Sequence, residues 1–359
     1  MTSRRVFLIV IILLILLLFC LVPFCMRFIK KPPMPPKPAF CPQFQKGMTY
    51  VTWNRTAYGA AFSDISLSNL AKTGTQWVGI HATWYQDTIN STEIKPSQKT
   101  PTDESVIHAI QQAHKLGLKV MLKPQVDVFD WRGGFWRGDV DFSKAEDWQA
   151  WFNSYKDFIV HYAKMAQEYN VELFCIGTEL TIPAVWQPEL WRKVVIKNVR
   201  EIYKGPITYA ANWNEEYLLI KFWDELDYVG LDPYFPLSDK EKPTLEDLKG
   251  GWKKHLEEIE DWQKRLNKPV IFAEIGYKSS TGAAKTPWEH GAGKEIDLQL
   301  QADCFEALLE TFWDKPWFYG VYWWYWGTNE RMGGPNNRGF VVQNKPAQEI
   351  VAKWYKKRR

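Results

Sequence analysis

Cysteine and histidine are scarce in this chain of 359 residues. Of its five cysteines, two lie within the first 25 residues, which leaves Cys41, Cys175 and Cys304 for the remainder. Three cysteines without the spacing of metal ligands indicate neither a disulfide framework nor a zinc site. The six histidines are scattered and include no pair at positions i and i+4. We therefore expect a protein without a bound metal.

An excess of charge of one sign is also absent, and so is a glycine-rich phosphate loop. The formal net charge is +4 at pH 7, and basic residues are concentrated only near the two ends of the chain. This pattern argues against nucleic acid as a partner. The segment after the first predicted strand, residues 53–59, reads WNRTAYG and lacks the glycines of an open nucleotide-binding sheet.

An apolar run extends from residue 6 to residue 26 without a charged side chain. A run of this length can cross a bilayer as a helix. No small-x-small cleavage pattern follows it, which favours a retained anchor over a cleaved signal. We expect residues 1–30 to form a transmembrane helix or signal anchor. Basic residues on both sides leave its orientation open, and we favour an extracytoplasmic catalytic domain, periplasmic or at the cell surface.

Residues 31–40 include the segment KPPMPPKP, which is typical of a stiff, extended spacer. The remaining residues, 41–359, are enough for one large domain of the (β/α)8 kind, which typically takes about 250 residues. No second globular domain is required.

Short apolar runs bounded by turn signals alternate with helical patterns through this domain. The alternation predicts an α/β fold with a parallel sheet, and eight units with none left over predict closure into a (β/α)8 TIM barrel. One helix is expected to begin at Asp103 and to stop at Gly117, and Ser143 with Glu146 predicts a capping box at the start of another. The expected strands are 48–53, 76–81, 119–124, 171–177, 207–211, 228–231, 270–273 and 318–323.

Several loops that leave the predicted strands are long, whereas loops that enter strands are short. The segments 125–142, 277–293 and 327–340 are the clearest long loops. In barrels of this kind the loops after the strands build the active site. The chain has 20 tryptophans, and Trp136 and Trp288 lie among glycines in these loops. Flat aromatic faces there would form the walls of a sugar-binding cleft.

Two strand-like segments end in glutamate: FCIGTE closes the fourth strand with Glu179, and VIFAE closes the seventh with Glu274. A charge at the end of an apolar strand must be solvated, paired or used, because burying it alone is costly. An ion pair would explain either glutamate alone, but two at the same mouth favour a catalytic pair. Neighbouring carboxyl groups drive each other's pKa values apart, as a glycoside hydrolase requires of its acid and its nucleophile.

Four motifs accompany these glutamates: IGTE at 176–179, FAEIGY at 272–277, LKPQVD at 122–127, and a tail from Gly339-Phe340 to NKPA at 344–347. Together they resemble clan A glycoside hydrolases, and within the clan glycoside hydrolase family 113, over nearly all of the chain after Pro38. The resemblance implies a retaining hydrolase of β-linked glycans, closest to an endo-β-1,4-mannanase. Glu179 would be the acid/base and Glu274 the nucleophile, with no cofactor, and their carboxyl groups would lie about 5–5.5 Å apart.

The chain departs from the clan at two positions. Many members have asparagine directly before the acid/base, where it binds the sugar 2-hydroxyl, and this chain has Thr178. The clan also tends to have an arginine near the end of strand two. Here that strand runs into His81, and Arg55 after strand one is the candidate substitute.

Further candidates for substrate binding follow from their places at strand ends. Tyr234 could also bond the nucleophile or fill the core, and Lys123 with Asp127 could form a sugar-binding pair or a structural salt bridge. Trp324 and Trp326 are two positions apart, so their side chains lie on the same side of the strand, and both are expected to face the mouth. The full set of expected substrate-binding residues is Trp53, Lys123, Asp127, Asn212, Trp213, Asp232, Tyr234, Trp288, Trp324 and Trp326.

Two other functions fit the same pattern. A catalytically inactive barrel would keep the groove and bind carbohydrate without turnover. A membrane-tethered barrel of envelope assembly would hold a glycan or a protein partner and would expose an apolar patch on its outer helices. We rank the hydrolase first, with an oligo- or polysaccharide as its partner and the N-terminal helix as its attachment to the membrane.

Overall fold

The computed structural model describes residues 41–130, 132–289, 291 and 295–359, of which Pro42–Arg359 belong to one compact unit. The predicted anchor at 1–30 and the predicted spacer at 31–40 lie outside the described residues. No helix in the described part is long and apolar enough to cross a membrane. Its three cysteines, Cys41, Cys175 and Cys304, are unpaired thiols.

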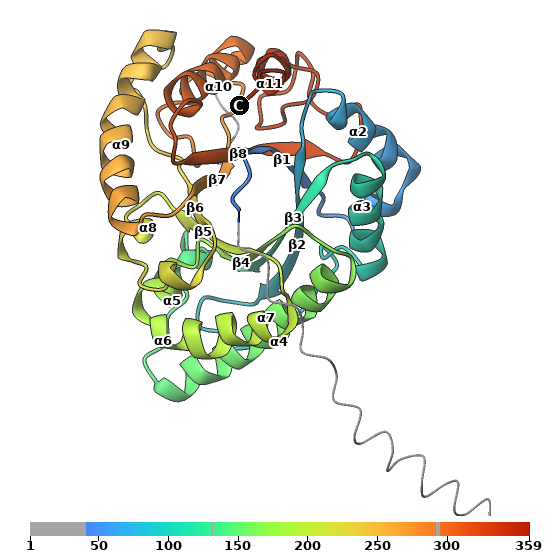
Figure 1. Cartoon of the computed structure of the whole chain (residues 1–359), viewed down its shortest axis with the longest axis vertical. Coiled ribbons are helices and arrows are strands. Elements are labelled where there is room, and N and C mark those ends of the chain that lie inside the picture. The colour runs from blue at the N-terminus through green and yellow to red at the C-terminus, as the bar shows by residue number, and fades with distance from the viewer. Residues whose placement is uncertain (1–40, 131, 290, 292–294) are drawn as a thin grey trace, which may run out of the picture. The chain divides into compact units, whose positions relative to one another are not determined.

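Eight parallel strands close into a barrel in the order of the chain, with the last strand paired to the first (Figure 1). The predicted (β/α)8 architecture is therefore confirmed. The second, third and eighth strands run four to five residues past their predicted ends. The strands are β1 Gln45–Val51, β2 Trp77–Gln86, β3 Lys119–Val128, β4 Leu173–Thr178, β5 Ile207–Asn212, β6 Val229–Asp232, β7 Val270–Ile275 and β8 Phe318–Gly327.

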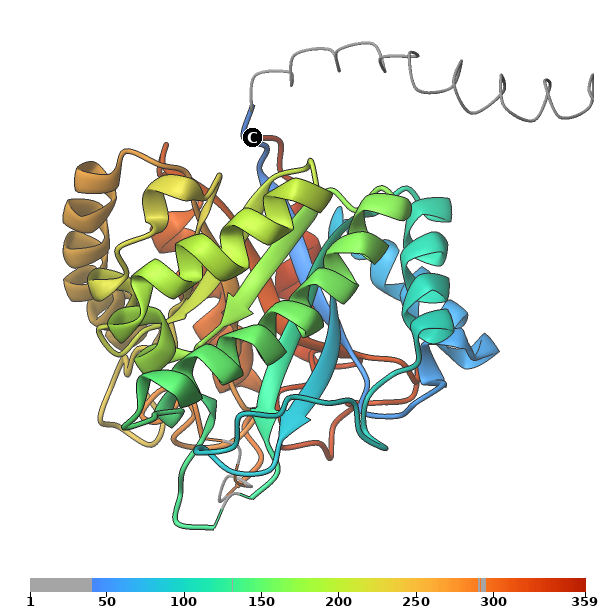
Figure 2. The same cartoon turned by 90° about the horizontal axis from the view of Figure 1, so that it is seen from below.

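Helices cover the outside of this barrel (Figure 2). The α-helices are α2 Ala61–Ala71, α3 Asp103–Lys115, α4 Ala145–Glu168, α5 Thr181–Trp186, α6 Pro188–Leu190, α7 Lys197–Ile202, α8 Glu216–Leu219, α9 Leu245–Leu266, α10 Leu298–Phe312 and α11 Pro346–Tyr355. Short turns of other helix types are η1 Ala57–Gly59, η2 Arg137–Asp139, η3 Trp191–Ile196 and η4 Trp223–Glu225.

The predicted helix boundaries were right in one case and wrong in the other. Helix α3 begins at Asp103, where the side chain of Thr102 accepts the N–H of Ser105 as an N-cap. The capping box predicted from Ser143 is absent, because α4 begins one residue later, after Lys144, and has no side-chain cap. Glu146 is then the second helical residue and cannot reach back as the third would.

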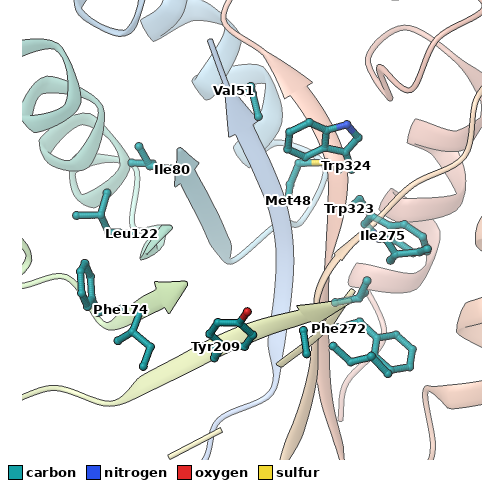
Figure 3. Packing of buried hydrophobic residues seen from close by; sticks show 14 of the residues in the cluster. Met48, Val51, Ile80, Leu122, Phe174, Tyr209, Phe272, Ile275, Trp323 and Trp324 are labelled. Atoms are coloured by element: carbon teal, nitrogen blue, oxygen red, sulfur yellow. The ribbon is translucent and has the colours of Figure 1, made fainter. Parts of the chain in front are cut away.

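The apolar core has two layers. Side chains of all sizes, from Cys175 and Ala273 to Trp77, fill the barrel interior. A larger cluster packs between the strands and the helices, and Figure 3 shows several of its members, including Phe272 and Trp323. Trp323 stacks on Phe305 of α10 with ring centroids 3.8 Å apart. Alternate residues of each strand thus serve the two layers.

Bulges interrupt this alternation on the two strands that end in glutamate. On β4 the four residues 175–178 face the three residues 208–210 of β5, and on β7 the four residues 272–275 face the three residues 321–323 of β8. Ile271 and Ala273 both face the interior, so strict alternation would turn Glu274 outward. The extra residue restores its inward direction, which is how bulges re-aim side chains beside active sites.

Closure between β8 and β1 depends on a glycine. Gly320 has a φ of +131°, and a Cβ built on it would lie 2.1 Å from the carbonyl oxygen of Gln45 on β1. We predict that Gly320→Ala lowers the free energy of unfolding by about 2–4 kcal/mol through backbone strain and overlap. Urea denaturation measures the change.

The matched control is Gly250→Ala in α9, where a Cβ would meet nothing within 4 Å. This variant should gain roughly 0.5–1 kcal/mol from helix propensity. Equal effects of the two substitutions would contradict the closure argument.

Candidate active site

A cavity of about 530 Å³ opens at the carboxyl ends of the strands, and all eight strands or the loops that follow them contribute to its lining. Both glutamates line it. Seven of the ten predicted binding residues line it as well, whereas Lys123, Asp232 and Trp326 do not. The seven are Trp53, Asp127, Asn212, Trp213, Tyr234, Trp288 and Trp324.

Glu179 follows the last residue of β4 in the left-handed region, with a φ of 49°. Its own N–H donates to the carbonyl of Ala210 on β5 at 2.8 Å, which fixes the backbone at this turn. The two carboxylate oxygens have different partners. Asn212 donates to Oε1 from Nδ2 at 2.9 Å, and Arg137 donates to Oε2 from Nη1 at 2.8 Å.

Glu274 also has a partner on each oxygen. The ammonium group of Lys123 donates to Oε2 at 2.8 Å, and the hydroxyl of Tyr234 donates to Oε1 at 3.0 Å. Tyr234 therefore does what the sequence allowed as an alternative, which is to bond the predicted nucleophile, and it lines the cavity at the same time.

Lys123 and Asp232 lie beneath the cavity floor, and both side chains are fully buried. Their Nζ and Oδ2 atoms are 3.6 Å apart. Neither residue lines the cavity, so the structure places them as a buried ion pair and not among the residues that a sugar in the cavity would meet. The predicted pairing of Lys123 with Asp127 is also absent, since Lys123 pairs with Glu274 and Asp232 instead.

The two glutamates differ in the direction of their pKa shifts. Burial raises the pKa of Glu179, and the negative charge of Glu274 adds to the rise, although Arg137 opposes it. Burial, the largest single effect, would raise the pKa of Glu274 as well, but the charge and hydrogen bond of Lys123, together with His81 and Arg137, outweigh it and hold the pKa below its usual value. Glu179 thus binds a proton more readily than Glu274.

The pKa values of the buried lysine and aspartate are shifted as well. Burial lowers the pKa of Lys123, but Asp232 and Glu274 outweigh that effect and leave it raised. Burial raises the pKa of Asp232 well above its usual value, and Glu274 raises it further. Lys123 lies nearer to Glu274 than to Asp232, which agrees with a lowered pKa for Glu274 and a raised pKa for Asp232.

Arg137 belongs to the turn η2 in the long loop after β3. Besides Glu179, it has Asp127 as an ion-pair partner, with Nη2 and Oδ2 3.7 Å apart. With its amide oxygen toward the guanidinium, Gln125 accepts from Nη2 at 2.5 Å and from Nε at 3.3 Å. The sequence predicted this loop as a cleft wall and Asp127 as a site residue, but it gave no signal that Arg137 would turn inward.

A buried carboxyl group supports the acid/base side from behind. Glu216, the first residue of α8, accepts the N–H of Asn212 at 2.7 Å, the hydroxyl of Tyr209 at 2.5 Å and that of Thr181 at 3.2 Å. Burial raises the pKa of Glu216 to about 8. The sequence did not predict this residue, because a glutamate in a short helix after a strand has no distinguishing pattern.

Aromatic side chains form the walls of the cavity. Trp213 and Trp288 stack on each other with ring centroids 4.9 Å apart, and they join the loops after β5 and β7. On another wall Trp53 meets Trp324 edge to face at 6.3 Å. Trp136, from the loop after β3, lines the cavity as well.

The expectation that Trp326 faces the mouth together with Trp324 is wrong. The four residues 323–326 of β8 face the three residues 48–50 of β1. This extra residue reverses the parity beyond Trp324. The indole N–H of Trp326 consequently donates to Ser66 of α2, on the outside of the barrel.

His81, in the middle of β2, lines the cavity, and Arg55 does not. Arg55 is exposed and donates to the carbonyl of Ser97. Burial lowers the pKa of His81 to about 3, so the imidazole is neutral at pH 7. Its Nε2 is buried without a hydrogen-bond partner among the described residues. Those residues also contain no cluster of histidine, cysteine, aspartate or glutamate that could hold a metal ion.

A closed (β/α)8 barrel with two buried glutamates in a tryptophan-walled mouth has the form of a glycoside hydrolase. The profile of Glycoside Hydrolase Family 113 matches residues 48–345, and the chain belongs to this family. It is therefore a glycoside hydrolase. No curated protein matches the chain in sequence.

Solved structures agree with this assignment. The complex structure of a GH113 beta-1,4-mannanase shares 30% identity and a TM-score of 0.79, covering 88% of this chain and 100% of that one. The GH113 beta-mannanase AaManA from Alicyclobacillus acidocaldarius, in complex with ManMIm, shares 28% identity and a TM-score of 0.78, covering 87% and 97%. A beta-glucuronidase from Ruminococcus gnavus, 14% identical with a TM-score of 0.61, covers 88% and 50% and shares the fold alone.

The raised pKa of Glu216 has a consequence for stability. Between the usual pKa of a glutamate and about 8, the folded chain holds a proton that the unfolded chain has lost. Stability from this group is therefore fully present at low pH and is lost as the pH rises through that window. We predict that the stability advantage of wild type over Glu216→Gln shrinks between pH 5 and pH 8, by an amount on the order of 3 kcal/mol.

Urea denaturation at several pH values measures this difference. The matched control is Glu215→Gln, since Glu215 is the exposed neighbour in the chain. Its difference from wild type should stay flat with pH. A flat difference for Glu216→Gln as well would show that the buried carboxyl is ionised throughout.

Proposed function

We propose that the chain is a retaining, endo-acting β-1,4-mannanase in which Glu179 is the general acid/base and Glu274 the nucleophile. The observation that carries the proposal is the opposite direction of the two pKa shifts at one mouth. A double displacement needs one carboxyl that keeps a proton and one that is ionised, and the environments of these two glutamates favour that division.

In the first step the carboxylate of Glu274 attacks the anomeric carbon while Glu179 gives its proton to the leaving oxygen. The bond to the leaving sugar breaks, and a covalent glycosyl ester forms on Glu274. In the second step Glu179, now ionised, takes a proton from water, and the water oxygen displaces the ester. Two inversions at the anomeric carbon leave its configuration retained.

The partners of Glu274 suit a nucleophile. Lys123 keeps it ionised, and the hydroxyl of Tyr234 holds one oxygen in place. Both contacts reduce the nucleophilicity of the carboxylate, so their role is to orient it and not to activate it. As the ester forms, Lys123 loses its negative partner Glu274 and keeps the buried Asp232 as its neighbour.

The cavity suits a neutral glycan. The two cations of the site, Lys123 and Arg137, already have carboxylate partners among the described residues, so neither is free to receive a uronic acid. Paired tryptophans such as Trp213 and Trp288 offer apolar faces for sugar rings. Mannan as the particular neutral glycan is taken from the two GH113 β-mannanases named above.

The mechanism predicts how removal of each carboxyl changes the reaction. Wild-type protein, full length in detergent, should cleave β-1,4-manno-oligosaccharides and release the β-anomer first, as seen by proton NMR. Glu274→Ala should have no detectable turnover. Glu179→Ala should lose about 10²–10⁴-fold in rate on these substrates. On an aryl β-mannoside with a good leaving group, which needs no acid in the first step, azide should restore part of the rate and yield a β-glycosyl azide because it attacks the glycosyl ester.

A panel of other β-linked glycans accompanies the mannan substrates. Cleavage of a different glycan, again lost in both variants, would keep the mechanism and discard mannan. Initial release of the α-anomer would discard retention. Binding of mannan without any turnover would favour a catalytically inactive carbohydrate-binding barrel.

We also propose that the chain is anchored in a membrane by residues 6–26, with the barrel on the extracytoplasmic side. The support is the length of the uncharged apolar run. After alkaline carbonate extraction, the full chain should stay with the membrane pellet, and a chain lacking residues 1–30 should not. Protease added to intact spheroplasts should digest the barrel, and complete protection would place it in the cytoplasm.

A further inference from the structure

The proposed acid/base has no free oxygen. Asn212 donates to one oxygen of Glu179 at 2.9 Å, and Arg137 donates to the other at 2.8 Å. The site thus presents two N–H donors to this carboxyl group. Such an arrangement favours the ionised form, because both N–H donors stabilise the negative charge and Arg137 also carries a positive charge. A general acid, however, must hold a proton and direct it at the leaving oxygen.

One of the two donors is fixed. Asn212 is the last residue of β5, and its backbone N–H is held by the buried carboxyl of Glu216. Its side-chain oxygen accepts the N–H of Asn214 at 2.8 Å, so the amide cannot turn without losing a second bond. Asn212 could therefore release Glu179 only by breaking its hydrogen bonds with Glu216 or Asn214.

The other donor, Arg137, has a second carboxylate within reach. Arg137 lies on a single turn of 3-10 helix in a loop, and its guanidinium already borders Asp127 and Gln125. Asp127 is 3.7 Å from Nη2, so a small movement of the guanidinium would exchange one carboxylate for the other. Both Asp127 and Arg137 line the cavity, where a sugar can displace or attract them.

We propose that Arg137 is a movable cap on Glu179: substrate draws its guanidinium over to Asp127, which frees Oε2 to carry the catalytic proton, and the guanidinium returns when the glycosyl ester has formed. This inference rests on the proposed function. Arg137 is a positioning residue in it, since it acts through Glu179 and takes no proton itself.

The charges around Glu179 decide what the movement does. Lys123 and Asp127 face it from β3, Asp232 from β6, Glu274 from β7 and Glu216 from α8, and the neutral His81 borders the site from β2. With the cap in place, Arg137 stabilises the ionised carboxylate. With the cap on Asp127, the nearby charge of Glu274 favours the protonated form, and once the ester forms that charge is gone. The cap therefore reinforces the change from acid to base between the two steps.

Two pH profiles distinguish a movable cap from a fixed partner. The pH at which kcat/KM falls on the alkaline side (its alkaline limb) gives the pKa of Glu179 in the free enzyme. The corresponding pH for kcat gives the pKa of Glu179 in the enzyme–substrate complex. For an unactivated manno-oligosaccharide, Arg137→Gln should move the limb of kcat/KM upward by about one pH unit, since a neighbouring arginine lowers a carboxyl pKa by 1–3 units. The limb of kcat should stay where it is, because in the complex the cap has already left.

The matched control is Arg132→Gln. Arg132 lies in the same loop, its side chain is 91% exposed, and it pairs with Asp130, so neither limb should move. Arg137→Lys keeps the positive charge. Its alkaline limb of kcat/KM should therefore lie at a pH between those of the wild type and Arg137→Gln. Equal shifts of both limbs would overturn the proposal, because they would show that the arginine stays on Glu179 throughout.

Asp127→Asn tests the second position and guards against a misfolded Arg137→Gln. It removes the charge that receives the cap, so kcat on the unactivated substrate should fall severalfold while the limb of kcat/KM does not rise. An unchanged kcat would overturn the proposal.

A measurement without turnover separates this inference from the proposed function. Carbon-13 NMR of protein labelled at the glutamate carboxyl, assigned with Glu179→Gln, follows the titration of Glu179 directly. Its pKa should rise in Arg137→Gln and should rise in wild type when a thio-linked manno-oligosaccharide binds. No change in either case overturns the cap, whereas failure of wild type to cleave any glycan would overturn the function alone.

Discussion

A buried ammonium group is the constraint on which the rest of this site depends. Lys123 is fully enclosed, and it can remain charged there only because Glu274 and Asp232 lie against it. In turn its charge is the largest of those that lower the pKa of Glu274. In the proposed double displacement, this charge is what keeps the nucleophile ionised. One lysine on β3 thus acts on the carboxyl group that β7 presents to the cavity.

On the opposite side of the mouth, hydrogen-bond donors surround the carboxyl group of Glu179. Asn212 and Arg137 hold Glu179, and Glu216 holds the asparagine from behind. The hydrogen bonds of Asn212 and Glu216 fix the geometry of this side, whereas the ion pairs of Arg137 with Glu179 and of Lys123 with Glu274 act on the proton affinities of the two carboxyl groups. Aromatic walls exclude water above them and leave the carboxyl groups in a medium where each charge has a large effect.

The sequence was sufficient for the barrel and for most of the mouth, because both follow from periodicity. Strands at the right intervals predicted closure, and strand ends predicted where polar side chains would gather. The predictions failed where a bulge breaks the alternation of a strand, or where the outcome depends on how deeply a side chain is buried. A bulge on β8 turned Trp326 outward, and the same device on β7 turned Glu274 inward. Lys123 was found but placed too near the sugar, since burial depth is a property of neighbours. Arg137 was missed because its direction is set by a loop.

The stacked pair Trp213 and Trp288 couples two loops that are 75 residues apart in the chain. Neither loop can be lengthened, shortened or exchanged without unstacking a ring that the other loop presents. Variation in cleft shape among related barrels would then have to occur in both loops together, as a correlated change. For protein engineering, the pair of loops after β5 and β7 is the unit to transplant when the cleft is to accept a glycan of another shape.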